Sequence, residues 1–183
     1  MSKQKCFRSR TGVLVKSSRS RYDIHIRCER IKKMNALFSL SVVTAVLCGI
    51  WSVFAGWIGL IGWAGFAGCT TYFACGEHGA DGVKKAMMTN LVGVMCGYLT
   101  IIIGKIWPVL GEWGIACAMI TFLMCMVSKY KVLNYCPGIF VGCFSSFAAA
   151  GDWTGLVIAL VLGAVLGMAC DLGGDYLFKR FQK

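Results

Sequence analysis

The sequence contains one stretch of 43 residues, Met34–Gly76, without a single Asp, Glu, Lys or Arg. A helix that crosses the hydrocarbon core of a bilayer needs about 20 apolar residues. The stretch is therefore long enough to cross twice, and Gly56, Gly59 and Gly62 with Trp57 supply a flexible interfacial turn near its middle. A chain with such a stretch, 57% apolar and only 15% charged, is a membrane protein. This excludes a soluble enzyme, a coiled coil, a disordered chain and a disulfide-rich secreted module.

Four further uncharged runs follow, each long enough for one helix: Ala86–Gly104, Trp113–Ser128, Val132–Gly151 and Trp153–Cys170. With the two helices of the first stretch, they predict an all-α membrane domain of six transmembrane helices over residues 34–178. We expect these helices near residues 34–55, 59–76, 84–104, 109–128, 132–150 and 154–172. A short basic tail, residues 179–183, follows them.

The net charge of +11 is concentrated in the first 33 residues, which hold 11 of the 19 Lys and Arg. A basic arm beside a membrane span is attracted by anionic lipid at the cytoplasmic surface. Nucleic-acid binding is disfavoured because the arm has no recognisable motif and only two aromatic residues. Residues 1–33 are thus interpreted as a disordered, lipid-facing arm or as an upstream extension before Met34, and an organellar targeting peptide is the weaker alternative.

The loop charges predict the orientation. With the N-terminus inside, seven basic residues fall on the cytoplasmic side, and Lys105 alone falls outside. The seven are Lys84, Lys85, Lys129, Lys131, Lys179, Arg180 and Lys183. Cytoplasmic loops of membrane proteins carry such an excess of Lys and Arg, so we expect both termini in the cytoplasm.

An internal repeat suggests how the helices are arranged. At an offset of 74 residues, Phe66–Ala74 lies over Phe140–Ala148 with five identities in nine positions. The same offset sets Gly93 against Gly167 and Cys96 against Cys170. Each half then has three helices, so the second half enters the bilayer from the opposite side. Inverted repeats of this kind are typical of transporters and channels, and duplication in a membrane protein without a transport role is the alternative.

Several segments carry a resemblance to a known family: Gly49-Ile50-Trp51, Gly62–Phe66, Gly68-Cys69-Thr70, Tyr72–Cys75 and Gly151-Asp152-Trp153. Together with Pro137-Gly138, Phe140 and Gly142, they resemble the YcdZ-like bacterial inner-membrane proteins. The resemblance covers roughly residues 34–175. It implies a small multispanning protein of the bacterial inner (cytoplasmic) membrane, and because the family is of unknown function, it implies no activity and no site residues.

Glycines mark positions where helices can approach closely. We expect this packing role for Gly65, Gly68, Gly93, Gly97, Gly138, Gly142, Gly163 and Gly167. The faces they form serve packing within the chain, or between copies in a homo-oligomer.

Polar residues within the predicted spans are hydroxyls and one amide. The candidates for lining a pore are Thr70, Thr71, Tyr72, Asn90, Ser145 and Ser146. Thr71 and Ser145 are related by the repeat, so an inverted arrangement can bring them together at mid-membrane. The alternative is that each hydroxyl bonds a carbonyl of its own helix. Glu77, His78 and Asp152, near opposite ends of the spans, are candidates for a gate, with solvated loop positions as the simpler interpretation.

No charged residue is expected at mid-membrane, which disfavours a proton-driven or ion-coupled pump. No catalytic arrangement, cofactor motif or Cys-x-x-Cys spacing is present, so no enzyme, cofactor or metal site is expected. The leading hypothesis is a passive channel or facilitator for a small uncharged solute. The alternative is a membrane protein without transport, in a structural, assembly or stress-related role.

Overall fold

A computed structural model describes residues 35–109 and 114–181. All the regular structure within these residues is helical, and the basic arm 1–33 and the end of the tail lie outside them. The first helix spans Asn35–Trp57. It is followed by α2 (Gly62–Ala74), α3 (Gly79–Ile106), α5 (Ile115–Val127), the short 3-10 helix η1 (Lys131–Leu133), α6 (Cys136–Ala148) and α7 (Trp153–Phe181).

Three of these helices are long and apolar enough to cross a membrane: the first helix, α3 and α7, with 23, 28 and 29 residues. The other three, α2, α5 and α6, have 13 residues each. At 1.5 Å per residue, 13 residues rise about 20 Å, against about 30 Å for a hydrocarbon core. Six full spans therefore stay a prediction.

The short helices are bounded by residues with a left-handed backbone conformation. The lengths of the uncharged runs, from which the helices were predicted, do not show these breaks. Gly59 (φ 68°) precedes α2, Gly114 (φ 67°) precedes α5, and Ala150 (φ 49°) follows α6. Conversely, α7 continues nine residues beyond the predicted end at 172, and Lys179 and Arg180 are helical where we expected a tail. The extension is held by the first helix, because Leu40 and Val43 pack on Gly174 and Gly173.

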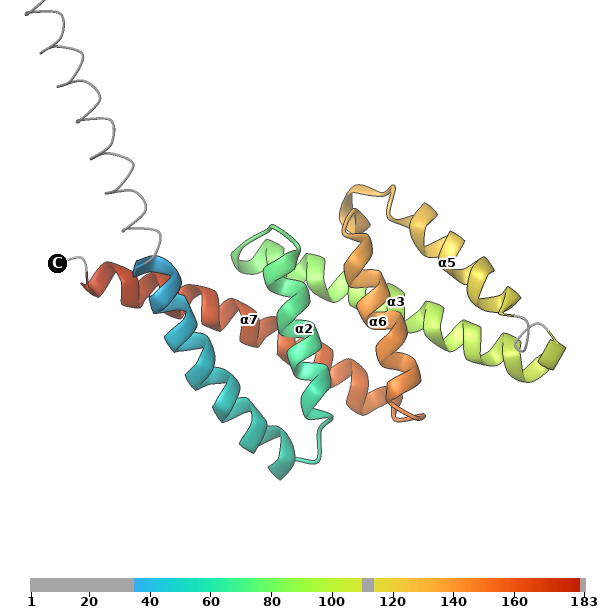
Figure 1. Cartoon of the computed structure of the whole chain (residues 1–183), viewed down its shortest axis with the longest axis horizontal. Coiled ribbons are helices and arrows are strands. Elements are labelled where there is room, and N and C mark those ends of the chain that lie inside the picture. Colours follow the sequence, from blue (N-terminus) through green and yellow to red (C-terminus); the bar gives the residue numbers. More distant parts are fainter. Residues whose placement is uncertain (1–34, 110–113, 182–183) are drawn as a thin grey trace, which may run out of the picture.

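The helices are arranged around a central pair. In Figure 1, α2 and α6 lie at the centre, with the first helix beside the C-terminal half of α7 at one end and α5 beside the C-terminal half of α3 at the other. Among the labelled helices, the most extensive contacts join α2 to α7 and α3 to α6. Helices of the first half of the sequence therefore pack mainly on helices of the second half. We call the two contact regions together the seam.

Glycine makes the seam possible. A Cβ added at any of the eight glycines expected to pack helices would come within 3.0 Å of an atom from another helix. At five of them the nearest atom is a backbone carbonyl oxygen: Leu160 for Gly68, Ile139 for Gly93, Cys143 for Gly97, Asn90 for Gly142 and Gly65 for Gly163. The seam is therefore a backbone-to-backbone contact, which any larger residue would force apart.

The contacts on the two sides of the seam correspond. Gly93 of α3 meets the Ile139 carbonyl of α6, and Gly163 of α7 meets the Gly65 carbonyl of α2. Ile139 follows Gly65 by 74 residues, as the sequence repeat requires, but Gly163 follows Gly93 by 70. The expected matches of Gly93 with Gly167 and of Cys96 with Cys170 are thus displaced by one helical turn. The cause is that α3 carries one more turn than α7 between its start and the seam.

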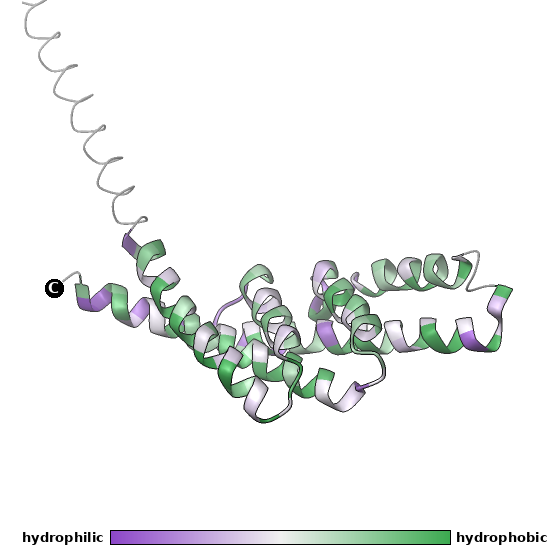
Figure 2. Ribbon diagram, turned by 60° about the horizontal axis from the view of Figure 1, so that its bottom comes forward, coloured by the Kyte–Doolittle hydropathy of each residue, from purple (hydrophilic) through white to green (hydrophobic). Residues whose placement is uncertain are grey.

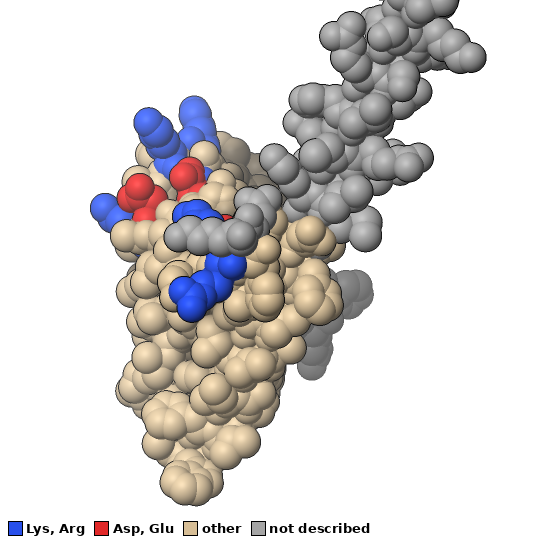
Figure 3. Space-filling model, turned by 90° about the vertical axis from the view of Figure 1, so that its left-hand side faces the viewer, with Lys and Arg blue, Asp and Glu red and all other residues tan. Residues whose placement is uncertain are grey.

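The outer surface is apolar, whereas the buried residues are mostly small. Figure 2 shows hydrophobic residues along most of every helix. Exposed large side chains include Phe38, Trp57, Met95 and Phe122, and the buried set is rich in Ala, Cys, Ser and Thr. In the view of Figure 3, Lys, Arg, Asp and Glu gather toward one end and leave the rest of that face uncharged. This surface suits contact with lipid.

Candidate functional site

Five of the six predicted pore-lining residues lie inside the protein. Thr71, Tyr72, Asn90, Ser145 and Ser146 are each at most 1% exposed. Thr70 lies on the exposed side of α2 instead, where its hydroxyl donates to the Phe66 carbonyl at 2.9 Å.

Thr71 and Asn90 connect α2 to α3 in the first half. The Thr71 hydroxyl lies 3.0 Å from both the Ala67 carbonyl of its own helix and Asn90 Oδ1. Its single proton can serve one acceptor at a time or be shared between the two. Asn90 Nδ2 is buried and has no hydrogen-bond partner among the described residues.

The second half lacks this connection. Ser145 corresponds to Thr71, but the residue in the position of Asn90 is Leu160, because Gly142 meets Asn90 where Gly68 meets Leu160. Ser145 Oγ is accordingly buried without a partner within the described part of the chain. Ser146 is satisfied locally, donating to Gly142 O at 3.1 Å or to Val94 O at 3.3 Å.

Thr71 packs on α6 far from the position of Ser145 along that helix. The Thr71 methyl group faces Gly138, near the start of α6, and a Cβ added at Gly138 would lie 3.0 Å from it. Ser145 follows Gly138 by seven residues, which is about 10 Å along a helix axis. The mid-membrane pairing of these two residues stays a prediction.

The candidate gate residues lie at opposite ends of the short helices. Glu77 and His78 follow α2, and Asp152 follows α6. Glu77 and Asn134, the latter just before α6, line the same hollow, so α2 ends where α6 begins. Asp152 acts locally: its Oδ1 accepts the Gly155 N–H at 2.9 Å and so caps α7.

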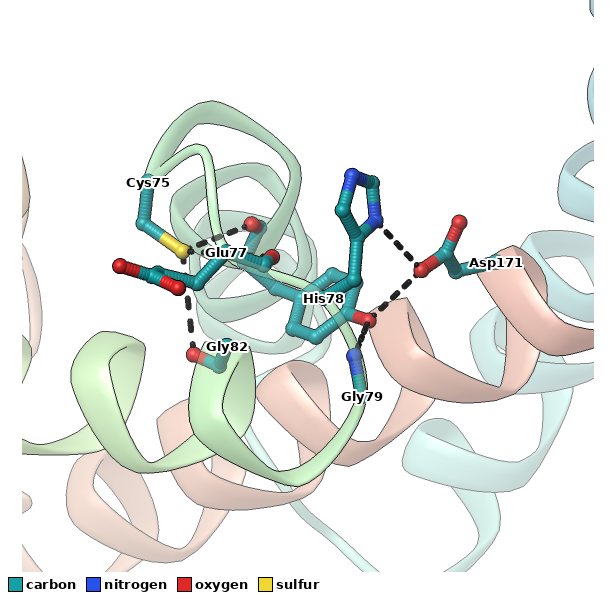
Figure 4. Close-up of polar contacts among 7 residues, drawn as sticks. Cys75, Glu77, His78, Gly79, Gly82 and Asp171 are labelled. Atoms are coloured by element: carbon teal, nitrogen blue, oxygen red, sulfur yellow. Dashed lines mark hydrogen bonds and ion pairs between the residues drawn. The ribbon is translucent and has the colours of Figure 1, made fainter.

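A polar cluster of four residues ties the α2–α3 loop to α7, and we call it the clasp (Figure 4). Tyr72 Oη donates to Asp171 Oδ2 at 2.9 Å and accepts the Gly79 N–H at 2.8 Å. His78 Nδ1 lies 2.9 Å from the same Asp171 oxygen. The Asp171 side chain is 18% exposed, whereas that of His78 is 80% exposed. Hydrogen bonding to Asp171, followed by its negative charge, raises the pKa of His78.

Two further contacts stabilise the same loop. The Cys75 thiol lies 3.1 Å from the Tyr72 carbonyl at the end of α2, and 3.8 Å from the carbonyls of Glu77 and Gly82. Lys85 Nζ forms an ion pair with Glu77 Oε1 at 3.3 Å. The predicted gate residue Glu77 is thus paired with the beginning of α3.

The sequence analysis missed the clasp because Asp171 falls at the end of the predicted helix 154–172, and because Tyr72 was expected to line a pore. An acidic residue inside a long apolar helix, with a tyrosine on another helix, was the available signal. No three His, Cys, Asp or Glu residues come together as a metal site requires within residues 35–109 and 114–181.

Long apolar helices, an apolar exterior and a small-residue interior define the class of the protein as an all-helical integral membrane protein. The chain belongs to a family described as proteins of unknown function (DUF1097), which matches residues 41–175. It is 38% identical over 151 residues to the inner membrane protein YcdZ of Escherichia coli K12, covering 82% of this chain and 93% of the relative.

The chain is also similar to two other relatives. The inner membrane protein YcdZ of Salmonella typhimurium is 36% identical over 151 residues, covering 82% of this chain and 94% of the relative. The uncharacterized protein YahC of E. coli K12 is 22% identical over 163 residues, covering 82% and 98%. No solved structure matches the chain. The resemblance to YcdZ-like proteins is thus confirmed, and the chain is an inner-membrane protein.

Proposed function

We propose that the chain forms two inverted three-helix halves, which together cross the inner membrane six times with both termini in the cytoplasm. The proposal is supported by the equivalent contacts in the seam: α2 packs on α7 in the same way as α6, its counterpart in the second half, packs on α3. It is also supported by Glu77, Lys84 and Lys131, which line one hollow although Glu77 lies just before α3, Lys84 lies near its start and Lys131 lies in η1. Reporter fusions at residues 77–85 and 150–154 test it, and a common side for both sites contradicts it.

For the role of this domain, we infer structural assembly rather than conduction along the seam, and no catalysis. The observation that carries this inference is the packing at Gly68, Gly93, Gly142 and Gly163, where backbone meets backbone. A contact without room for a Cβ has no room for a solute. Thr71 and Ser146 support the same inference, because their hydroxyls donate to carbonyls nearby.

The first helix provides a surface for assembly with further copies of the chain. A hollow of about 550 Å³ lies along its outer side, and its lining is Val46, Gly49, Ile50, Val53, Phe54 and Trp57. A Cβ added at Gly49 would meet nothing within 4 Å. A second copy can therefore approach this face closely. The basic arm, which lies outside the described residues, is proposed to hold the assembly against anionic lipid.

Liposome swelling with urea, short amides, glycerol and ammonia tests the inference. We expect permeability equal to that of empty liposomes for every solute. Native mass spectrometry of the same preparation should show oligomers that Gly49→Phe dissociates. Gly56→Phe is a control on the same helix, because Gly56 also meets nothing within 4 Å but does not line the hollow. Oligomers that survive Gly49→Phe contradict the assembly surface.

One observation favours the second candidate, a passive facilitator of a small uncharged solute. Asn90 Nδ2 and Ser145 Oγ are both buried without a partner among the described residues, in a region of the protein without charge. Such atoms can hydrogen-bond a solute that has lost its water. Uptake of one solute that Thr71→Val with Ser145→Val abolishes would replace the assembly role with this one.

A further inference from the structure

Two hollows meet at Lys84, near the start of α3. One is apolar, with a volume of about 290 Å³, and its walls come from α3 and α7: Val83, Met87, Met88, Leu91 and Met168, together with Lys84. The other measures about 440 Å³ and is lined by Glu77, Asp81, Lys84, Lys85, Lys131 and Asn134. Lys84 thus separates an apolar groove from a charged pocket.

The charged pocket has a surplus of positive charge. Three lysines and two acidic residues line it, and Lys85 is paired with Glu77 at 3.3 Å. Asp81 lies in the first turn of α3, where the positive end of the helix dipole stabilises a carboxylate. Lys84 and Lys131 are exposed, and neither forms an ion pair with another described residue. Two ammonium groups therefore face one hollow and are available to an anion.

The apolar groove continues from Lys84 along one stripe of α3. Lys84, Met87, Met88 and Leu91 are spaced three, four and seven residues apart, so they follow one another along the helix. From Lys84 to Leu91 the stripe extends about 10 Å. Met88 is 41% exposed, so the groove is open to the surroundings. Methionine side chains adapt to a flexible apolar ligand.

We propose that this composite site binds one anionic phospholipid. Its phosphate lies between the ammonium groups of Lys84 and Lys131, and one acyl chain follows Met87, Met88 and Leu91. A lipid fits this site better than a soluble phosphate, because the apolar groove and the charged pocket share Lys84. A soluble phosphate would occupy the charged pocket and leave the groove empty. The residues of this site belong neither to the segment 1–33 nor to the assembly surface of the first helix.

Native mass spectrometry of the full chain from mixed micelles tests the proposal. The probes are phosphatidylglycerol and phosphatidylcholine with matched acyl chains. We expect the protein to retain phosphatidylglycerol at least tenfold better, and Lys84→Gln with Lys131→Gln to abolish that preference. Lys105→Gln, at the other end of α3, is the control and should retain it. Each variant must elute as the wild type does and melt at the same temperature in phosphatidylcholine.

Glycerol 1-phosphate distinguishes the lipid from its headgroup. If the groove holds an acyl chain, millimolar glycerol 1-phosphate leaves the bound phosphatidylglycerol in place, whereas a longer-chain phosphatidylglycerol displaces it. Equal retention of the two lipids by the wild type overturns the proposal. So does an effect of Lys105→Gln as large as that of the double variant, or displacement by glycerol 1-phosphate.

The result of this lipid-binding experiment does not depend on whether the protein assembles through its first helix. Gly49→Phe lies on the first helix, away from both hollows, and should retain phosphatidylglycerol even if it dissociates the oligomer. Loss of the lipid in Gly49→Phe would place the lipid between copies, which contradicts a site on α3.

Discussion

Adding one methyl group at Gly142 should destabilise the protein, although alanine favours helices. Its Cβ would fall on the Asn90 carbonyl oxygen, and would lie 2.9 Å from the Val94 nitrogen on the same helix. These are backbone atoms of α3, so no side chain can turn away, and α6 and α3 must separate along the seam. Overpacking of this kind costs about 1–3 kcal/mol.

The matched control is Gly56→Ala, in the last turn of the first helix and outside the proposed assembly surface. It makes the same chemical change, but the new Cβ meets nothing within 4 Å. The higher helix propensity of alanine should leave the protein equally stable or more stable, by up to about 1 kcal/mol.

Thermal unfolding in detergent, followed by fluorescence-detected size exclusion, measures both variants. For a chain of this size, 1 kcal/mol shifts Tm by about 2–4 °C, so a cost of about 1–3 kcal/mol should lower the Tm of Gly142→Ala by about 2–12 °C relative to the wild type. Gly163→Ala, which meets the Gly65 carbonyl on the other side of the seam, should behave alike. A Tm for Gly142→Ala at or above that of Gly56→Ala would refute backbone contact at the seam.

Three further predictions concern the polar groups. Because Asp171 raises the pKa of His78, the pair of these two residues contributes stability that is complete below the unfolded pKa of about 6.5 and is lost as pH rises through the folded pKa. The Tm of the wild type should therefore fall between roughly pH 5 and pH 9, and this pH-dependent fall should be smaller in His78→Gln. Tyr72→Phe leaves the Gly79 N–H without its acceptor and should cost about 1–2 kcal/mol, so that proteolysis of the α2–α3 loop is faster than in wild type; an unchanged rate counts against the clasp. Ser145→Ala removes a buried hydroxyl without a partner and should leave Tm unchanged or raised, whereas Thr71→Val loses the bond to Asn90 and should lower it; equal losses would contradict the difference between the halves.

These residues show why the site was only partly predictable. The glycine spacing, the hydroxyls of α2 and α6 and the amide of α3 are local features, so Thr71, Asn90 and Ser146 could be singled out as polar residues within the predicted spans, there as candidates for lining a pore. Their partners are not local. Tyr72 and Asp171 are 99 positions apart, and the bond between them depends on α2 packing against α7. The pairing of hydroxyls at mid-membrane was inferred from the repeat alone, which says nothing of where along a helix the halves cross.

The sequence by itself determined the class of environment: a run of 43 residues without charge has one stable solvent, the hydrocarbon of a bilayer, and its similarity to YcdZ assigns it to the inner membrane. The positions of the glycines in the sequence also predicted where helices can pack closely. Tertiary structure decided which atoms each glycine meets and that Asp171 pairs with Tyr72 and His78. It also decided that the corresponding contacts of α3 and α7 are shifted by one helical turn from the positions that the sequence repeat predicts. The physical reason is that hydrophobicity depends on each residue alone, whereas register and hydrogen bonding depend on two helices at once.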